Sequence, residues 1–126
     1  MKRIDLLYWA VTGLLSVQLL AAVAMYFTDP AIRAGFAHLG FPDYFRVELG
    51  IAKGLGALAI LLPLVPLRVK EWAYAGLGIV FISAFIAHTA VDGPATGMAP
   101  LISLLLLAVS YVCLHRRADT PVHGRA

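Results

Sequence analysis

Lys53 and Glu48 are the residues of this sequence best suited to acid–base or ligand chemistry, because both lie in a run of apolar residues. A charged side chain near the centre of a membrane-spanning helix costs about 2.5–3.5 kcal/mol on insertion scales, whereas each Leu, Ile or Val returns about 0.3–0.6 kcal/mol. The apolar residues from Val47 to Leu64 barely offset that cost for Lys53 together with the smaller cost of the shallower Glu48. Ionisable side chains in such runs face the interior of a helix bundle and mark a proton or ligand site. A structural ion pair or hydrogen bond within the bundle is the alternative for Lys53.

Helix angle and depth indicate which side chains surround these two. Glu48 lies about 140° from Lys53 at about 100° per residue, so the two do not pair within their own helix. When about 1.5 Å is counted per residue, polar residues of the other apolar runs reach a similar depth. We expect them to form a polar pocket in one half of a bundle, from Gln18, Glu48, Lys53, His88 and Ser103. In the other half, only Thr12 and Ser16 are comparable.

His88 shares a helix face with aromatic residues, namely Phe81, Phe85 and, further along, Tyr74. An aromatic wall beside a histidine suits a flat hydrophobic ligand such as a quinone, although ordinary packing gives the same spacing. His88 is either an interfacial side chain bonded to its neighbours or a proton and ligand group. No second haem or metal ligand lies opposite it, so no metal site is predicted. The candidate catalytic residues are Lys53, His88 and Glu48, and the candidate ligand-binding residues are Gln18, Tyr26, Tyr74, Phe81, Phe85 and Ser103.

Four apolar runs must position these residues. Hydrophobic residues make up 61% of the 126 residues and charged residues 13%, against about 45–50% and about 25% in soluble domains. A domain this small cannot bury so much apolar surface, so the lipid bilayer is the expected surrounding. A bilayer core of about 30 Å requires about 20 helical residues. We therefore expect an all-α membrane protein, a four-helix transmembrane domain over residues 1–117 with spans at 4–27, 44–64, 71–91 and 98–114, and a disordered polar tail at 118–126.

Lysine and arginine residues gather on one side of this expected bundle. The N-terminus, the loop between the second and third spans, and the C-terminal tail hold seven of them, whereas the opposite side holds only Arg33 and Arg46. By the positive-inside rule, both termini are cytoplasmic and the polar pocket lies in the outer half of the bundle. Because the basic residues flank apolar runs, no nucleic-acid partner is expected.

The segment at residues 29–43 is expected to form a short amphipathic helix between the first two spans. Asp29 can cap it with Pro30 at its first position, and Ile32, Phe36 and Leu39 give it one apolar face. Such a helix either lies in the outer interface or folds over the mouth of the bundle as a lid.

Four segments carry a family pattern: HLGFP at 38–42, LGIAKGLGALAILLP at 49–63, KEWAYAGL at 70–77, and the stretch at 88–94. In this order and spacing they resemble the DoxX-like family of small bacterial four-helix membrane proteins, over roughly residues 8–111. The resemblance implies a multi-pass protein of the bacterial inner membrane. The wider group includes a subunit of a thiosulfate:quinone oxidoreductase and members associated with oxidative or quinone stress. Lys53 matches the lysine of the family's G-x-x-K-x-x-G stretch, whereas residues 21–25 depart from the Ser-Gly-x-x-K-like pattern of many relatives.

Three functions fit these observations. The first is a quinone- or lipophile-linked redox component, which needs a bound quinone or a partner subunit because Cys113 is the only cysteine. The second is a non-enzymatic scaffold or small-molecule carrier, as a homo-oligomer or with a partner. The third is a small lipophile-modifying enzyme, of isomerase or cyclase type, in which Glu48 and His88 act as an acid–base pair. The sequence leaves open whether the chain is an enzyme.

Overall fold

The computed structural model describes residues 2–119, which form five α-helices and one 3₁₀-helix and contain no strand. The expectation of an all-helical chain is confirmed. The elements are α1 (Arg3–Thr28), α2 (Pro30–His38), α3 (Asp43–Leu61), α4 (Leu67–Asp92), η1 (Pro94–Gly97) and α5 (Met98–Asp119).

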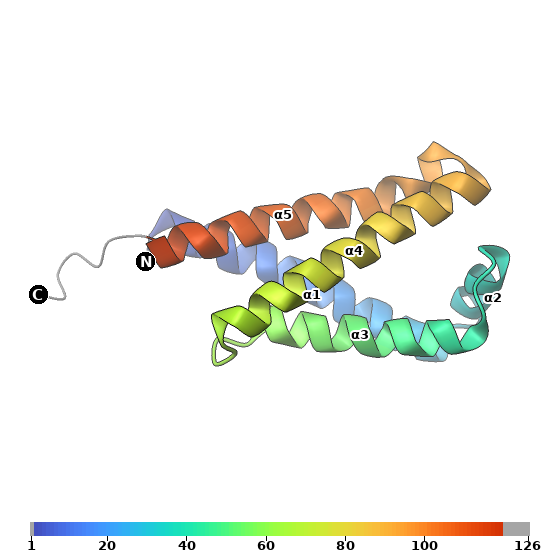
Figure 1. Ribbon diagram of the computed structural model, residues 1–126, viewed down its shortest axis with the longest axis horizontal. Coiled ribbons are helices and arrows are strands. Elements are labelled where there is room, and N and C mark those ends of the chain that lie inside the picture. Colours follow the sequence, from blue (N-terminus) through green and yellow to red (C-terminus); the bar gives the residue numbers. More distant parts are fainter. Residues whose placement is uncertain (1, 120–126) are drawn as a thin grey trace, which may run out of the picture.

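The four long helices lie side by side, and each runs antiparallel to the long helix before it (Figure 1). α1 packs against α3 and α5, and α4 packs against the same two helices. The terminal end of the bundle holds Lys2, the loop at 62–66 and the end of α5, whereas the α2 end holds α2 and η1 (Figure 1). The N-terminus and the end of α5 therefore lie at the same end of the molecule.

Among the described residues, three helical stretches are long and apolar enough to cross a membrane: Arg3–Thr28, Leu67–Asp92 and Pro94–Arg117. Large apolar side chains on their outer faces are exposed, including Leu14 at 59%, Val17 at 66% and Ile79 at 66%. Burying such faces in lipid is favourable, so the chain is a membrane protein. α3 is shorter, at 19 residues, and carries charged residues at Asp43, Arg46, Glu48 and Lys53.

The helix ends differ from the expected spans for local reasons. α3 stops at Leu61 rather than residue 64, because Pro63 disfavours helical geometry in the residue before it. α5 continues past residue 114 to Asp119. Residues 118 and 119 thus belong to α5 rather than to the expected tail, and the rest of that prediction lies outside the described residues.

α2 forms where a short helix was expected. The Asp29 side chain accepts a hydrogen bond from the Ala31 backbone N–H at 2.9 Å, and Pro30 occupies the first position. His38, at the other end of α2, lies 2.7 Å from Asp92 at the end of α4, between Nε2 and Oδ1. α2 is therefore tied to α4 as well as to its chain neighbours.

Candidate functional site

A lysine–tyrosine pair joins α3 to α1 in the half of the bundle near α2. Lys53 Nζ donates a hydrogen bond to the Tyr26 hydroxyl at 2.6 Å, and the ammonium lies 4.7 Å from the centre of the Tyr26 ring. Gly50 lets the two helices approach, since a Cβ there would lie 2.9 Å from the Phe27 ring. Tyr26 is the only hydrogen-bond partner of Lys53 among the described residues. An ammonium has three N–H donors, so Lys53 can still donate to a ligand.

The aromatic residues of α2 and its flanks cover this pair. The Phe36 ring meets the Tyr26 ring edge-on at 5.2 Å between centres. Phe36 also packs against Phe41 at 6.1 Å and Phe45 at 6.3 Å, and Phe41 stacks on Phe45 at 4.8 Å. Edge-on and offset contacts of this kind stabilise aromatic clusters. α2 is thus held against α1 and α3 beside the Lys53–Tyr26 pair.

Asp43, the first residue of α3, anchors α2 through two arginines. Arg33 donates to it from Nε at 2.9 Å and from Nη2 at 2.8 Å, and Arg46 donates from Nε at 3.0 Å. These two guanidinium groups hold the pKa of the Asp43 carboxyl well below its usual range. The buried Arg46 also donates to the Tyr26 carbonyl oxygen. Asp43 and Arg46 therefore fix the end of α1 and the start of α3 together.

The structure does not bring the residues of the expected pocket together. Gln18 Nε2 of α1 donates to Ser103 Oγ of α5 at 2.7 Å. Glu48 is exposed on α3 and has no hydrogen bond or ion pair within residues 2–119. His88 is half-buried on α4, and its backbone oxygen accepts from Thr96 Oγ1 at 2.9 Å. No hydrogen bond or ion pair joins Glu48 to either Lys53 or His88 in this part of the chain.

The aromatic residues expected beside His88 lie at different depths of the bundle. Phe81 is 4% exposed and belongs to the hydrophobic core. Phe85 packs against Gly97, where a Cβ would lie 2.9 Å from its ring. Tyr74 lies nearer the terminal end and hydrogen-bonds across the interior of the bundle.

A buried hydroxyl network lies in the half of the bundle near the termini. Ser110 Oγ lies 2.6 Å from the Tyr74 hydroxyl and 2.6 Å from Thr12 Oγ1, linking α5 to α4 and α1. Thr12 and Ser110 are fully buried, as is Ser16 one turn further along α1. The expectation that only Thr12 and Ser16 carry polar chemistry in this half is therefore wrong. The sequence could have predicted this network, because Tyr74 and Ser110 lie at the same depth as Thr12 when residues are counted from the ends of their helices.

Lys70 is the second feature that sequence reasoning missed. It was counted as a loop charge, but it is only 6% exposed. Its ammonium donates to three backbone oxygens around the end of α3, those of Ala59 at 2.9 Å, Ile60 at 3.1 Å and Leu62 at 2.8 Å. The last carbonyls of a helix lack partners within the helix, so Lys70 satisfies them.

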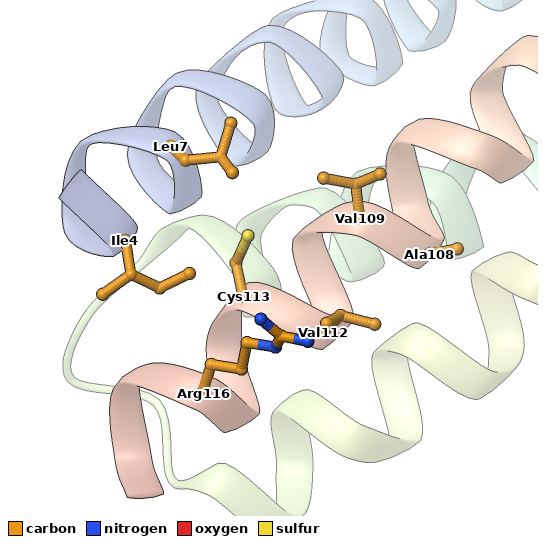
Figure 2. Close-up of a pocket in the computed structure, with 7 residues that line it drawn as sticks. All are labelled: Ile4, Leu7, Ala108, Val109, Val112, Cys113 and Arg116. Carbon is orange, nitrogen blue, oxygen red and sulfur yellow. The ribbon is translucent and has the colours of Figure 1, made fainter. Parts of the chain in front are cut away.

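A cavity of about 310 Å³ opens between α1 and α5 at the terminal end, far along the bundle from α2 (Figure 2). It is lined by Ile4, Leu7, Val109, Val112, Cys113 and Arg116, among others. This cavity does not coincide with the expected outer-half pocket. Within residues 2–119, no group of three His, Cys, Asp or Glu side chains is placed to hold a metal ion.

Comparison with known proteins gives one result. The family model described as the DoxX-like family matches residues 10–110. Neither the curated proteins nor the solved structures contain a match to the chain. The match spans most of the 126 residues, including α2, the Lys53–Tyr26 pair and the hydroxyl network. The chain, a helical membrane protein with these features, therefore belongs to the DoxX-like family.

Proposed function

We propose that this DoxX-like protein is a quinone- or lipophile-linked redox component of the bacterial inner membrane, which binds the polar head of its ligand at Lys53 and Tyr26. One observation carries the proposal. Lys53 is half-buried between α3 and α1, yet its hydrogen-bond partner is a neutral phenol rather than a carboxylate. A cation retained in this place without an acid to neutralise it is typical of a functional site.

The donors of the site match the acceptors of a quinone. A quinone ring presents carbonyl oxygens, which accept hydrogen bonds, and the Lys53 ammonium and Tyr26 hydroxyl both donate. Gln18 and Ser103, which bond to each other on α1 and α5, are proposed to contact the ligand further across the bundle. His88 on α4 is the proposed proton carrier. Electrons must come from a partner subunit, because the chain has one cysteine and thus no redox-active cysteine pair of its own.

In this proposal α3 crosses the membrane as a fourth span, although its composition alone does not mark it as one. Its support is that Lys53 and Arg46 both find their acceptors on α1, so these cations need no contact with lipid. α2 then acts as a lid, whose Phe36 must leave the Tyr26 ring for a ligand to enter. The acid–base enzyme hypothesis has no such support, because Glu48 is exposed and, among the described residues, forms no hydrogen bond or ion pair with His88.

Binding of decylubiquinone to the purified protein tests the proposal. Lys53→Ala and Tyr26→Phe are each expected to weaken binding about tenfold, the loss of one hydrogen bond to a charged or buried group. Arg68→Ala, an exposed basic residue near the opposite end, is the matched control and should bind like the parent. Circular dichroism and gel filtration confirm that each variant is folded. If the folded Lys53 and Tyr26 variants bind as the parent does, the proposed site is wrong.

Mass spectrometry of lipophiles that co-purify in mild detergent gives an independent test. A quinone present in a fixed ratio to the protein would support the proposal. Its consistent absence from protein purified from quinone-replete membranes would instead favour the scaffold or carrier hypothesis.

A further inference from the structure

Lys53 is a cation between two helices that no carboxylate of the described chain neutralises. It is half-buried, and its one hydrogen bond within residues 2–119 goes to the Tyr26 hydroxyl at 2.6 Å. Arg46, the buried cation of the same helix, differs, because Asp43 accepts a hydrogen bond from its Nε at 3.0 Å. A charge withdrawn from water is costly unless an opposite charge accompanies it. An anion bound beside Lys53 would lower that cost.

The acidic side chains at the α2 end of the described chain are directed elsewhere. Asp43 is held by two arginines. Asp92 Oδ1 lies 2.7 Å from the imidazole at the end of α2, and Asp29 caps the start of that helix. Glu48 is exposed on the outward face of α3. Since none of these carboxylates forms a hydrogen bond or ion pair with Lys53, a bound ligand can supply the negative charge.

The two polar groups of the site can share one ligand oxygen. Lys53 Nζ and the Tyr26 hydroxyl oxygen are 2.6 Å apart, so a single oxygen atom can lie within hydrogen-bond distance of both. The hydroxyl accepts from the ammonium and keeps its own proton to donate, and the ammonium keeps N–H groups that Tyr26 does not use. Hydrogen bonds to an ionised oxygen are shorter and about twice as strong as those to a neutral one. The pair is therefore better suited to an oxyanion than to a carbonyl.

The rings beside the pair favour a flat anion over a compact one. Phe36 meets the Tyr26 ring edge-on at 5.2 Å, and Phe41 and Phe45 continue this aromatic cluster. Aromatic side chains bind flat rings through stacked and edge-on contacts, but they offer no donors to a small hydrated anion such as acetate or phosphate. An oxygen whose charge is delocalised over a ring also loses less hydration on entering such a place.

We propose that the Lys53–Tyr26 pair selects a ligand with an ionised oxygen on a flat ring, the class that includes hydroxyquinones, over an uncharged quinone of the same shape. This inference rests on the proposed function, because it concerns the same site and narrows the class of its ligand. The ionised oxygen accepts from Lys53 and Tyr26, and the ring lies against the aromatic cluster. The ligand binds as the anion, so no proton is transferred on binding.

Binding of two analogues to the purified full chain tests the selection. One is a decyl hydroxynaphthoquinone, whose hydroxyl is ionised in neutral buffer, and the other is its uncharged methyl ether. The parent is expected to bind the ionised analogue about tenfold more tightly, the effect of one hydrogen bond to a charged group. Lys53→Met should lose this preference. Arg68→Met, which changes an exposed residue near the opposite end, should keep it.

The comparison between chains separates the site from the detergent. Each analogue partitions into micelles to the same extent whichever chain is present, so a difference between parent and variant reports on Lys53. Circular dichroism and gel filtration verify that both variants are folded. The comparison of the two analogues on the parent requires no substitution, so the inference stays testable whatever the stability of Lys53→Met.

The outcomes distinguish this inference from the proposed function. Equal binding of the two analogues by the parent overturns the selection but leaves quinone binding at this site in place. A preference that persists in folded Lys53→Met overturns the assignment to Lys53. Binding of neither analogue overturns the proposed function together with this inference.

Discussion

Lys53, Arg46 and Lys70 are each stabilised by neutral oxygens of a neighbouring helix. Lys53 donates to the Tyr26 hydroxyl, and Arg46 donates to the Tyr26 carbonyl as well as to Asp43. Lys70 donates only to backbone carbonyls. The carbonyls at the C-terminal end of a helix carry partial negative charge, which favours a cation. In this protein, carbonyl oxygens at helix ends and one phenol thus stabilise cations between helices, a role that carboxylates commonly have in other proteins.

Removing the Lys70 ammonium should destabilise the protein. Lys70→Met keeps the length of the side chain but removes the ammonium that donates to three carbonyls around the end of α3. Hydrogen bonds to a charged group contribute about 1.5–3 kcal/mol, and we expect a loss of about that size in the free energy of unfolding. Chemical unfolding in detergent measures it. The exposed Arg68→Met should change stability by less than about 0.5 kcal/mol, and an equal effect of both substitutions would contradict the capping role.

At this scale the sequence predicted which residues are polar and how deep they lie, but not which of them meet. Ser103 is buried and Lys53 is half-buried, whereas Gln18 is exposed on α1. Their partners depend on which helices are neighbours, and depth along a helix carries no information on that. Because α1 lies between α3 and α5, Gln18 reaches Ser103 while Lys53 reaches Tyr26. Glu48 was placed with them by depth, but its helix angle turns it outward.

α2 is the element whose position depends most on individual side-chain contacts. Ring contacts of Phe36, the Arg33–Asp43 pair and the His38–Asp92 contact hold it at its end of the bundle. Its existence was predictable from Asp29 and Pro30, because a cap and the proline that follows it act locally. Its contact with α4 was not, since His38 and Asp92 are far apart in the sequence. The long helices were predictable for a simpler reason, the length of their apolar runs.

The attachment of α2 should resist acid. The folded-state pKa of Asp43 is held below its ordinary value by Arg33 and Arg46. Its contribution is therefore fully present above about pH 4, the ordinary range of an aspartate, and is lost only as the pH falls through the lower, folded-state pKa. Asp43→Asn lacks this contribution at every pH. We expect α2 of the parent to stay immobile from about pH 7 to about pH 4, and α2 of the variant to be mobile throughout.

A spin label at the exposed Ala37, in a chain with Cys113→Ala, reports the mobility of α2. Both chains also carry His38→Gln, which removes the imidazole that contacts Asp92, so that the mobility of α2 reports on Asp43. Equal mobility of the two chains would show that Asp43 does not anchor α2. Release of the parent's α2 between about pH 5 and about pH 4 would show that its carboxyl titrates ordinarily.

On the scale of the whole molecule, charge and topology agree. The N-terminus, the 62–66 loop and the end of α5 share one end of the bundle (Figure 1), which is the arrangement that the distribution of lysine and arginine requires. Three of the long helices are apolar enough to span a membrane by composition. The proposed orientation places the terminal end in the cytoplasm and α2 outside.

Single cysteines test that orientation. In a chain with Cys113→Ala, cysteines at Ala34 of α2 and Ala95 of η1 should react with a membrane-impermeant maleimide on intact cells. Cysteines at Lys2 and Arg68 should react only after the cells are permeabilised. The opposite pattern would reverse the orientation, and labelling of both Ala34 and Arg68 positions on intact cells would show that α3 does not cross the bilayer.

The Lys70 contact has a consequence for biogenesis. As α3 leaves the ribosome, Lys70 and α4 are still to be made, so the carbonyls of Ala59, Ile60 and Leu62 lack the ammonium that later binds all three. Only when α4 follows can Lys70 close the hairpin across the 62–66 loop. If α3 crosses the membrane as proposed, it should therefore enter the lipid together with α4, as a preassembled pair rather than as a single helix.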